Sequence, residues 1–309
     1  MGSGHYDSKL YTSSAHVRAA TGVKDFAHSD TVMSAPRDER KAHKDLDPLA
    51  IKDSVNHVRE SRDSKEHPES RAIAVMFDVT GSMQEVPQIF QKNLNKLMSL
   101  LVLKGKIEHP QILVGGIGDA TCDAIPSQVS QFESNNLIDE DIRKMVLEGG
   151  GGGQNTESYE LALYAMARLT SMDCWEKRHQ KGYLFLSGDE HPYPAVKKDE
   201  VKRVFGIGEQ SNISLKDIFD EVKEKFEVYF IIPAGTSHYK EVELFQDWAS
   251  YLGQHVLRLD DPSAICELIA STVAAEEGID IADIMESLKD AGTDTKTIKA
   301  VKKTLAAVK

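Results

Sequence analysis

Short apolar runs recur along the chain from residue 71 onward, and amphipathic stretches lie between them. The runs occupy residues 72–77, 111–118, 182–187, 226–233 and 255–259. A continuous apolar run of this length is typical of a strand that is buried on both faces, as in a parallel sheet. The alternation of such runs with helical stretches predicts an α/β fold, with a doubly wound, mostly parallel sheet flanked by helices.

The expected helices carry apolar residues at three- and four-residue steps, which is the spacing of one helix face. These sets span residues 86–101, 215–226, 242–252 and 265–273. Pro262 stands shortly before the last set, where a proline suits a helix start. The segment 128–134 is expected to form a short edge strand, antiparallel to the strand before it.

The two ends of the chain differ from this middle part. Residues 1–70 are polar and hold too few large apolar residues for a core of their own. We expect an N-terminal extension there that either wraps the main domain or stays partly mobile. The main domain is predicted at 71–277. Residues 278–309 read as a C-terminal helical hairpin, either packed on the main domain or docking to a partner.

The composition narrows the class of protein. The chain has 309 residues, 40% of them hydrophobic, and a formal net charge of −12. Nucleic acid is therefore not an expected partner, because it requires a clustered basic face. Cys122, Cys174 and Cys266 are far apart and odd in number, which fits a reducing compartment and argues against disulfides and a zinc site.

Targeting signals are also missing from the sequence pattern. No apolar run reaches the roughly 20 residues that a membrane span requires. The N-terminus lacks the apolar segment of a secretory signal. We therefore expect a soluble, cytoplasmic protein with no membrane partner.

Oxygen-bearing side chains follow the first apolar run. The motif DVTGSM places Asp78, Thr80 and Ser82 at alternate positions, just before a helical stretch. Alternate residues of a short loop can aim their oxygens at one point. One carboxylate and two hydroxyls make a hard-oxygen site, which suits Mg²⁺, Mn²⁺ or Ca²⁺ better than a soft metal.

Polar loops also follow other expected strands. Their acidic residues are Asp119 and Asp123 after the second run, and Asp189 and Glu190 after the third. The glycine run 149–153 leads to Thr156 and Glu157, at the start of a helical stretch. Ligands of open α/β sheets bind outside the carboxyl ends of the strands, so we expect these loops to converge on DVTGSM.

The DVTGSM motif, between an apolar strand and an amphipathic helix, resembles the von Willebrand factor type A (VWA) domain. That family has a Rossmann-like fold and carries a metal-ion-dependent adhesion site (MIDAS) with the pattern D-x-[ST]-x-S after its first strand. The glycine and the methionine of DVTGSM fit the intracellular bacterial or phage form. The resemblance covers roughly residues 70–275 and implies that Asp78, Thr80 and Ser82 are metal-site residues.

The same resemblance implies two further ligands, from loops that match the family pattern less closely. A threonine of the glycine-containing loop corresponds to Thr156, while the spacing to the next helix favours Glu157 as the ligand from that loop. The family's T-D-G loop corresponds to Ser187-Gly188-Asp189, where the carboxylate stands one position later. This correspondence implies Asp189 as the last ligand.

The resemblance also implies a function. A divalent cation, Mg²⁺ first with Mn²⁺ or Ca²⁺ as alternatives, would be ligated incompletely by the protein. An acidic side chain of a partner protein would complete its coordination shell, so the chain would be a binding module and not an enzyme. Intracellular relatives often work beside AAA+ ATPases or other assembly components, which makes such a protein a possible partner.

A second family shares part of the pattern. Haloacid dehalogenase-like (HAD-like) phosphatases use D-x-[DT]-G-[ST] after a first strand, with the aspartate as phosphoryl acceptor and Mg²⁺ as cofactor. This alternative would make Asp78 a nucleophile. Against it, the helical pattern starts by Val86 and leaves no room for a flap, and no Ser or Thr stands right at the end of the second strand.

Overall fold

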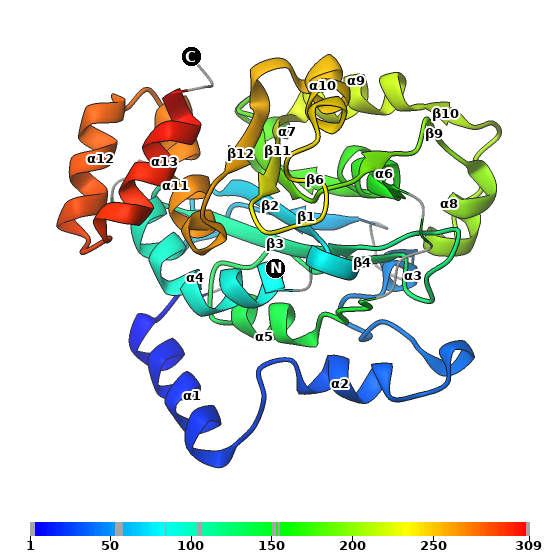
Figure 1. Cartoon of the computed structure of the whole chain (residues 1–309), viewed down its shortest axis with the longest axis horizontal. Helices are drawn as coiled ribbons and strands as arrows, with labels where there is room; N and C mark the ends of the chain where they lie inside the picture. The colour runs from blue at the N-terminus through cyan, green and yellow to red at the C-terminus, as the bar shows by residue number, and fades with distance from the viewer. Residues whose placement is uncertain are drawn as a thin grey trace.

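A computed structural model describes residues 4–52, 58–83, 85–103, 107–149, 153 and 155–306. Its centre is a six-stranded sheet with the strand order β12-β11-β7-β2-β3-β4 (Figure 1). The strands are β2 (Arg71–Asp78), β3 (Pro110–Ile117), β4 (Ser127–Val129), β7 (Gly182–Ser187), β11 (Phe226–Pro233) and β12 (Val256–Leu259). All adjacent pairs are parallel except β3 and β4, which are antiparallel. The predicted mixed α/β fold with a mostly parallel sheet is confirmed.

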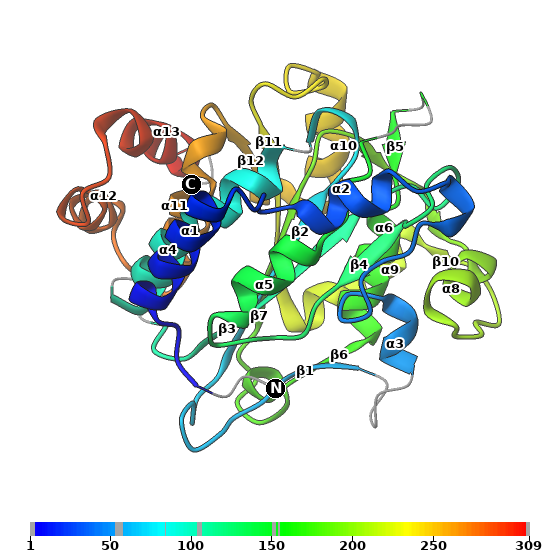
Figure 2. The ribbon, with the colours of Figure 1, turned by 90° about the horizontal axis from the view of Figure 1, so that it is seen from below.

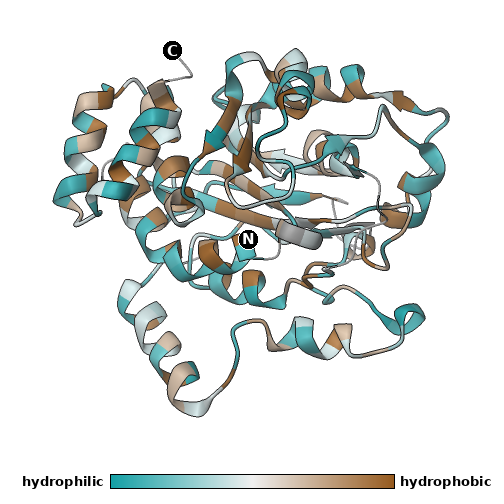
Figure 3. Cartoon of the chain, viewed as in Figure 1, coloured by the Kyte–Doolittle hydropathy of each residue, from teal (hydrophilic) through white to brown (hydrophobic). Residues whose placement is uncertain are grey.

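Helices cover both faces of this sheet. Successive side chains of a strand point to opposite faces, so the apolar strands present apolar side chains on both sides. Ile73 and Phe77 of β2 belong to one apolar cluster, and Ala72 and Met76 belong to the other. The first cluster includes residues of α4 (Glu85–Leu103), α5 (Leu137–Lys144) and α11 (Ile265–Glu276). The second includes residues of α6 (Tyr159–Arg168), α8 (Lys198–Phe205), α9 (Leu215–Lys225) and α10 (Val242–Leu252). In Figure 3 the strands between these layers are largely brown, the colour of apolar residues.

The N-terminal part of the chain forms α1 (Ser8–Thr21), α2 (Ala27–Met33), the 3₁₀ helix η1 (Arg37–Glu39) and α3 (Pro48–Lys52). Its first two helices lie against the first helical layer, whereas α3 lies beside β4 and α8 (Figures 1 and 2). Tyr11, Phe26 and Leu46 are buried and join the first apolar cluster. The Tyr11 hydroxyl also donates a hydrogen bond to the Gln91 carbonyl at 2.6 Å. In its described part, the N-terminal segment therefore packs these apolar side chains into the core of the main sheet and forms no core of its own. This agrees with its lack of periodic apolar positions.

The C-terminal part forms a helical pair. These helices are α12 (Ile281–Asp290) and α13 (Thr295–Ala306). Leu288, Val301 and Leu305 are buried in the first apolar cluster. Thr304 donates a hydrogen bond to the Arg258 carbonyl of β12 at 2.8 Å. The division into 1–70, 71–277 and 278–309 stays a prediction, as does docking of a partner to the helical pair.

Short elements complete the described chain. They are β5 (Thr156–Glu157), β8 (His191–Pro192), β9 (Ala195–Val196), β10 (Ile213–Ser214) and the 3₁₀ helices η2 (Gly81–Met83), η3 (Gly253–His255) and η4 (Pro262–Ala264). The strand β5 pairs with β8, and β9 pairs with β10. None of the described helices combines the length and apolar character that a membrane crossing needs. A cytoplasmic location stays a prediction.

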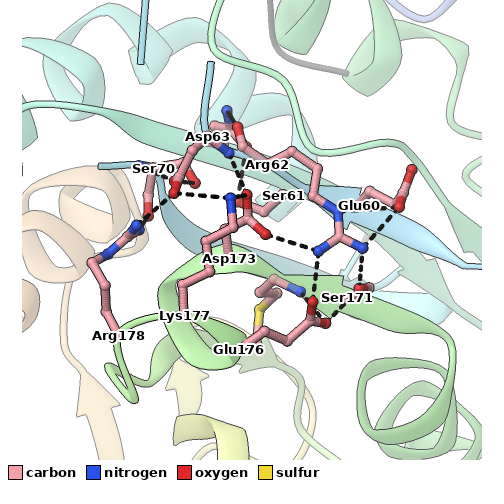
Figure 4. A network of polar contacts seen from close by, with 12 residues as sticks. Glu60, Ser61, Arg62, Asp63, Ser70, Ser171, Asp173, Glu176, Lys177 and Arg178 are labelled. Atoms are coloured by element: carbon pink, nitrogen blue, oxygen red, sulfur yellow. Dashed lines mark hydrogen bonds and ion pairs between the residues drawn. The ribbon is translucent and has the colours of Figure 1, made fainter. Parts of the chain in front are cut away.

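An ion-pair network connects the segment before β2 to the segment before β7 (Figure 4). Its elements are β1 (Arg59–Ser61), the parallel partner strand β6 (Thr170–Met172) and α7 (Asp173–Glu176). Arg62 lies 2.9 Å from Asp173 and 2.7 Å from Glu176, and Arg178 lies 2.7 Å from Asp63. The network crosses more than one hundred residues of sequence, so no local pattern could predict it.

We predict that Arg62→Ala lowers the free energy of unfolding by about 1–3 kcal/mol, because Asp173 is nearly buried and loses one of its cationic partners. Urea unfolding followed by circular dichroism measures the change. Lys65→Ala removes an exposed cation from the same segment and should shift the midpoint much less. Equal shifts in the two variants would show that the network does not stabilise the fold.

Candidate functional site

Asp78 ends the central strand at the carboxyl edge of the sheet. It is 0% exposed, although it carries a carboxyl group. The register pairs Phe77 of β2 with Ser187 of β7, so the loop Gly188–Asp189 starts at the level of Asp78. This neighbourhood follows from the sheet, because parallel strands bring their carboxyl ends to one edge. Two of the predicted loops therefore meet.

The Asp78 carboxylate has hydrogen-bond donors on both oxygens. Its Oδ1 accepts from the Thr80 backbone N at 2.9 Å and from the Thr80 hydroxyl at 2.6 Å. Its Oδ2 accepts from the Tyr159 hydroxyl at 2.9 Å. A side chain that binds the backbone N–H two residues on is typical of an aspartate in a turn. These three donors offset part of the cost of burying the carboxyl group.

Glu157 extends this arrangement. The Thr80 hydroxyl oxygen lies 3.0 Å from Glu157 Oε1 as well as 2.6 Å from Asp78 Oδ1. A hydroxyl has one proton to donate, so it cannot serve two ionised carboxylates at once. A protonated Glu157 resolves this conflict, since it donates to Thr80 while Thr80 donates to Asp78. The two contacts therefore favour a protonated Glu157 beside an ionised Asp78.

The pKa values of these acids are shifted accordingly. Burial raises the pKa of Asp78, an effect that its hydrogen bonds from Thr80 oppose and the charge of Asp189 reinforces. Burial, followed by the charges of Asp78 and Glu190, raises the pKa of Glu157 further. Burial and the charge of Asp78 raise the pKa of Glu190 to about 8. The fold therefore gathers acids whose negative charges are poorly compensated.

Three buried oxygens at this edge lack a hydrogen-bond partner within the described part of the chain. They are Glu157 Oε2, Glu190 Oε2 and Ser187 Oγ. Glu157 as a residue is only 2% exposed. Buried polar atoms are normally hydrogen-bonded, so these oxygens are available to accept a proton or to bind a cation. Carboxylate and hydroxyl oxygens are the ligands that a hard divalent cation prefers.

The loop after the glycine run contributes Glu157 and not Thr156 to this contact. Both residues form β5, where side chains alternate between the two sides of the strand. Glu157 approaches the Thr80 hydroxyl, so Thr156 faces the other way. The alternation explains why only one of the two competing candidates reaches the first motif.

Asp189 is 2% exposed and accepts a hydrogen bond at 3.1 Å from the backbone N of His238. The His238 ring in turn lies 2.6 Å from Glu241. Burial lowers the pKa of His238, but the hydrogen bond with Glu241 and the negative charges of Glu241, Asp189 and Glu190 together outweigh this effect and raise the pKa. Ser82 lies in the 3₁₀ helix η2, and its side chain is outside the described residues.

Asp119 and Asp123 form a separate turn beside the site. Asp119 Oδ1 accepts from the backbone N and the hydroxyl of Thr121, and its Oδ2 accepts from the Tyr193 hydroxyl at 3.0 Å. Asp123 accepts from the backbone N of Asp119 at 2.7 Å. These contacts make the second polar loop a well-bonded turn after β3.

Tyr159 is the site residue that sequence reasoning missed. It is the first residue of α6, and its ring packs edge-on against Phe230 and Trp248, with centroids 5.5 and 5.1 Å away. Gly188 makes room for it, because a Cβ at that position would overlap the Tyr159 hydroxyl. The sequence held two signals for this contact. One is an aromatic residue in the first turn of a helix after a polar loop, and the other is a glycine directly after a strand.

Comparison with known proteins adds little. No known protein family matches the chain, and no curated protein is similar to it in sequence. Among solved structures, the pilus adhesin SpaC from Lactobacillus rhamnosus GG aligns with a TM-score of 0.45 and 10% identity, over 70% of this chain and 31% of that one. Proximal thread matrix protein 1 from the mussel byssus aligns with a TM-score of 0.44 and 14% identity, over 66% and 48%. The chain spans about a third to a half of these proteins, and such scores carry no argument about function.

These findings overturn the recognition of the chain as a VWA protein with a MIDAS. No family matches. Within the described residues, no group of three or more His, Cys, Asp or Glu side chains has the arrangement of a metal centre. The physical reason is that Asp78 and Thr80 are bonded to one another in a turn, and Glu157 meets Thr80 from the glycine loop. The short motif alone was too weak to define the family.

We predict that the metal-free protein loses stability as the pH rises from 5 to 8. The folded state keeps protons on Glu157 and its neighbours at pH values where the unfolded chain has released them, so the free energy of unfolding falls with rising pH. Glu157→Gln should flatten this fall by about 2 kcal/mol, because the amide needs no proton. Urea unfolding at several pH values in the presence of a chelator measures the effect.

The matched control is Asp283→Asn, at an exposed position of α12. It should keep the pH dependence of the wild-type protein. A Glu157→Gln variant with the wild-type slope would contradict the assignment of a proton to this carboxyl group.

Proposed function

We propose that the chain binds a divalent cation at Asp78, Thr80, Glu157 and Asp189, and that the bound ion recruits a carboxylate from a protein partner. Mg²⁺ is the first choice, with Mn²⁺ or Ca²⁺ as alternatives. The observation that carries the proposal is the conflict at the Thr80 hydroxyl, whose single proton lies between two buried carboxyl groups. A divalent cation would relieve this conflict more fully than a proton, because it can accept electron density from several oxygens at once.

The donor set supports a hard cation. The unpartnered Glu157 Oε2 supplies a free carboxylate oxygen at the level of Asp78. Two or three carboxylates and a hydroxyl supply fewer ligands than a divalent cation binds. Water or a ligand from outside the protein would therefore occupy the remaining coordination positions. An ion with open positions keeps positive charge toward the solvent, which attracts a partner's carboxylate.

The topology supports the same location. In this proposal the sheet is read as doubly wound. The chain runs from β2 to β3 on one side and later enters β7 on the other side of β2. Ligands of doubly wound sheets bind where the strand order reverses, and here that point lies between β2 and β7. Asp78 follows β2 and Asp189 follows β7, one on each side of it.

The proposed partner is a protein that presents an Asp or Glu side chain to the ion. A component of a cytoplasmic multiprotein assembly, such as an AAA+ ATPase, fits this role. The binding role needs no covalent chemistry at Asp78, so the proposal does not make the chain an enzyme.

The phosphatase alternative requires that Asp78 be accessible to a substrate. A nucleophilic carboxylate needs an oxygen that an incoming phosphoryl group can reach. Asp78 is 0% exposed, and both of its oxygens accept hydrogen bonds, from Thr80 and from Tyr159. These contacts favour the binding role over the HAD-like reaction.

We predict that Mg²⁺ raises the melting temperature of the chelator-treated protein by several degrees. At a concentration of about 100 times its Kd, an ion that binds only the folded state adds about 2.7 kcal/mol. Glu157→Gln and Asp189→Asn should abolish the Mg²⁺ effect, whereas the exposed control Asp283→Asn should keep it. Glu157→Gln is the sharper variant, because it should be at least as stable as wild type without metal. An unchanged Mg²⁺ response in both site variants would place the ion elsewhere.

We also predict that an immobilised sample captures its partner only when Mg²⁺ or Mn²⁺ is present. A chelator should release the captured protein, and a Glu-containing peptide should compete with it, because the contact is a carboxylate on the ion. Asp189→Asn should lose the capture and Asp283→Asn should retain it. A parallel assay with a generic phosphate ester and Mg²⁺ tests the alternative. Turnover that vanishes in Asp78→Asn would favour the phosphatase and refute the binding role.

A further inference from the structure

Three histidines from three separate segments meet at the amino end of the sheet, away from Asp78. His5 belongs to the N-terminal segment, His67 to the loop between β1 and β2, and His109 directly precedes β3. The ring centroids of His5 and His67 are 4.7 Å apart, and those of His67 and His109 are 5.4 Å apart. His5 and His67 line a cavity of about 240 Å³, together with Glu108. The proposed cation site uses none of these residues.

The contacts of His67 determine which of its nitrogens carries the proton. Its Nε2 lies 2.7 Å from the carbonyl oxygen of Gly4. A carbonyl only accepts hydrogen bonds, so Nε2 carries the proton and Nδ1 of the neutral ring keeps its lone pair. This lone pair faces His109, whose Nδ1 lies 3.4 Å from His67 Nδ1. The ring itself is held in place, because His67 is only 2% exposed.

The separation of the two Nδ1 atoms is informative. It is longer than the roughly 2.7–3.2 Å of an ordinary hydrogen bond between nitrogen and its acceptor. Two imidazole nitrogens that bind one tetrahedral Zn²⁺ at about 2.0–2.1 Å lie about 3.3–3.4 Å from each other. The observed 3.4 Å is the length of a long hydrogen bond between the two rings, and it also equals the spacing of two ligands of a shared ion.

We propose that His67 and His109 bind a borderline transition-metal cation, with Zn²⁺ as the reference ion, through their Nδ1 atoms. The Gly4 carbonyl orients the His67 ring from behind, as outer partners of metal-bound histidines generally do. Water fills the remaining coordination positions in the cavity. Imidazole selects Zn²⁺, Ni²⁺ or Cu²⁺ over Mg²⁺, so this site differs in metal preference from the oxygen site at Asp78.

The ion would also secure the N-terminal segment. Gly4 is attached to the body of the protein through His67, through its backbone N to Glu66 at 2.5 Å, and through the Ser134 hydroxyl at 2.9 Å. Fixing the His67 ring with a metal strengthens the first of these contacts. Zn²⁺ binding is thereby coupled to docking of the residues that lead into α1.

The test uses the full-length, chelator-treated protein. Isothermal titration with ZnCl₂, in excess Mg²⁺ to occupy the oxygen site, should show one equivalent of Zn²⁺ bound by the wild-type protein. His67→Gln and His109→Gln should each weaken this binding at least tenfold. The exposed His16 of α1 provides the matched control His16→Gln, which should bind as wild type does.

A second measurement addresses folding and docking together. Because His67 is buried, the half-buried His109 offers the milder variant, and urea unfolding verifies that each variant is folded. Zn²⁺ should slow tryptic cleavage after the exposed Lys9 several-fold in wild type and in His16→Gln, but not in His109→Gln. No Zn²⁺ binding by the wild-type protein, or equal affinity in folded His109→Gln, would overturn the proposal and leave the pair as a long hydrogen bond.

Discussion

Burial of the Asp78 carboxyl group is the constraint around which this end of the molecule is organised. A strand in the middle of a parallel sheet ends between two helical layers, so a charged residue at its last position loses contact with water. Compensation comes from a turn through Thr80 and from the Tyr159 hydroxyl. The hydroxyl reaches Asp78 only because position 188 is a glycine and because Phe230 and Trp248 hold the tyrosine ring.

Much of the fold follows from local sequence, and the reason is the burial of the sheet on both faces. Each of the five apolar runs is short and lies between helical stretches, which favours a strand, and each became one of the strands β2, β3, β7, β11 and β12. The edge strand β4 was weaker as a signal, because it has only three residues and a single neighbour in the sheet. The pair β1 and β6 had no signal at all, since its support comes from Arg62 and its partners across the chain.

The site was predictable only as far as strand ends determine it. That Asp78 and Asp189 lie at one edge follows from parallel strands. The spacing to the next helix favoured Glu157 over Thr156, but which of the two side chains reaches Thr80 depends on the orientation of a two-residue strand. Tyr159 was missed because its role arises from packing. The N-terminal segment behaves similarly, since Tyr11 and Phe26 are single apolar residues without a period and find their partners only in the folded protein.

The shared hydroxyl of Thr80 has a consequence for the proposed cation site. In the proposed role, a cation that binds the Glu157 carboxylate would displace the proton of that carboxyl group, while the Thr80 hydroxyl keeps its own proton. Binding of the ion would then be coupled to release of a proton. Acidification would act as a competitive inhibitor, and any partner held through the ion would be released when the surroundings become acidic. The same arrangement would let the protein respond to metal supply and to pH through a single group of atoms.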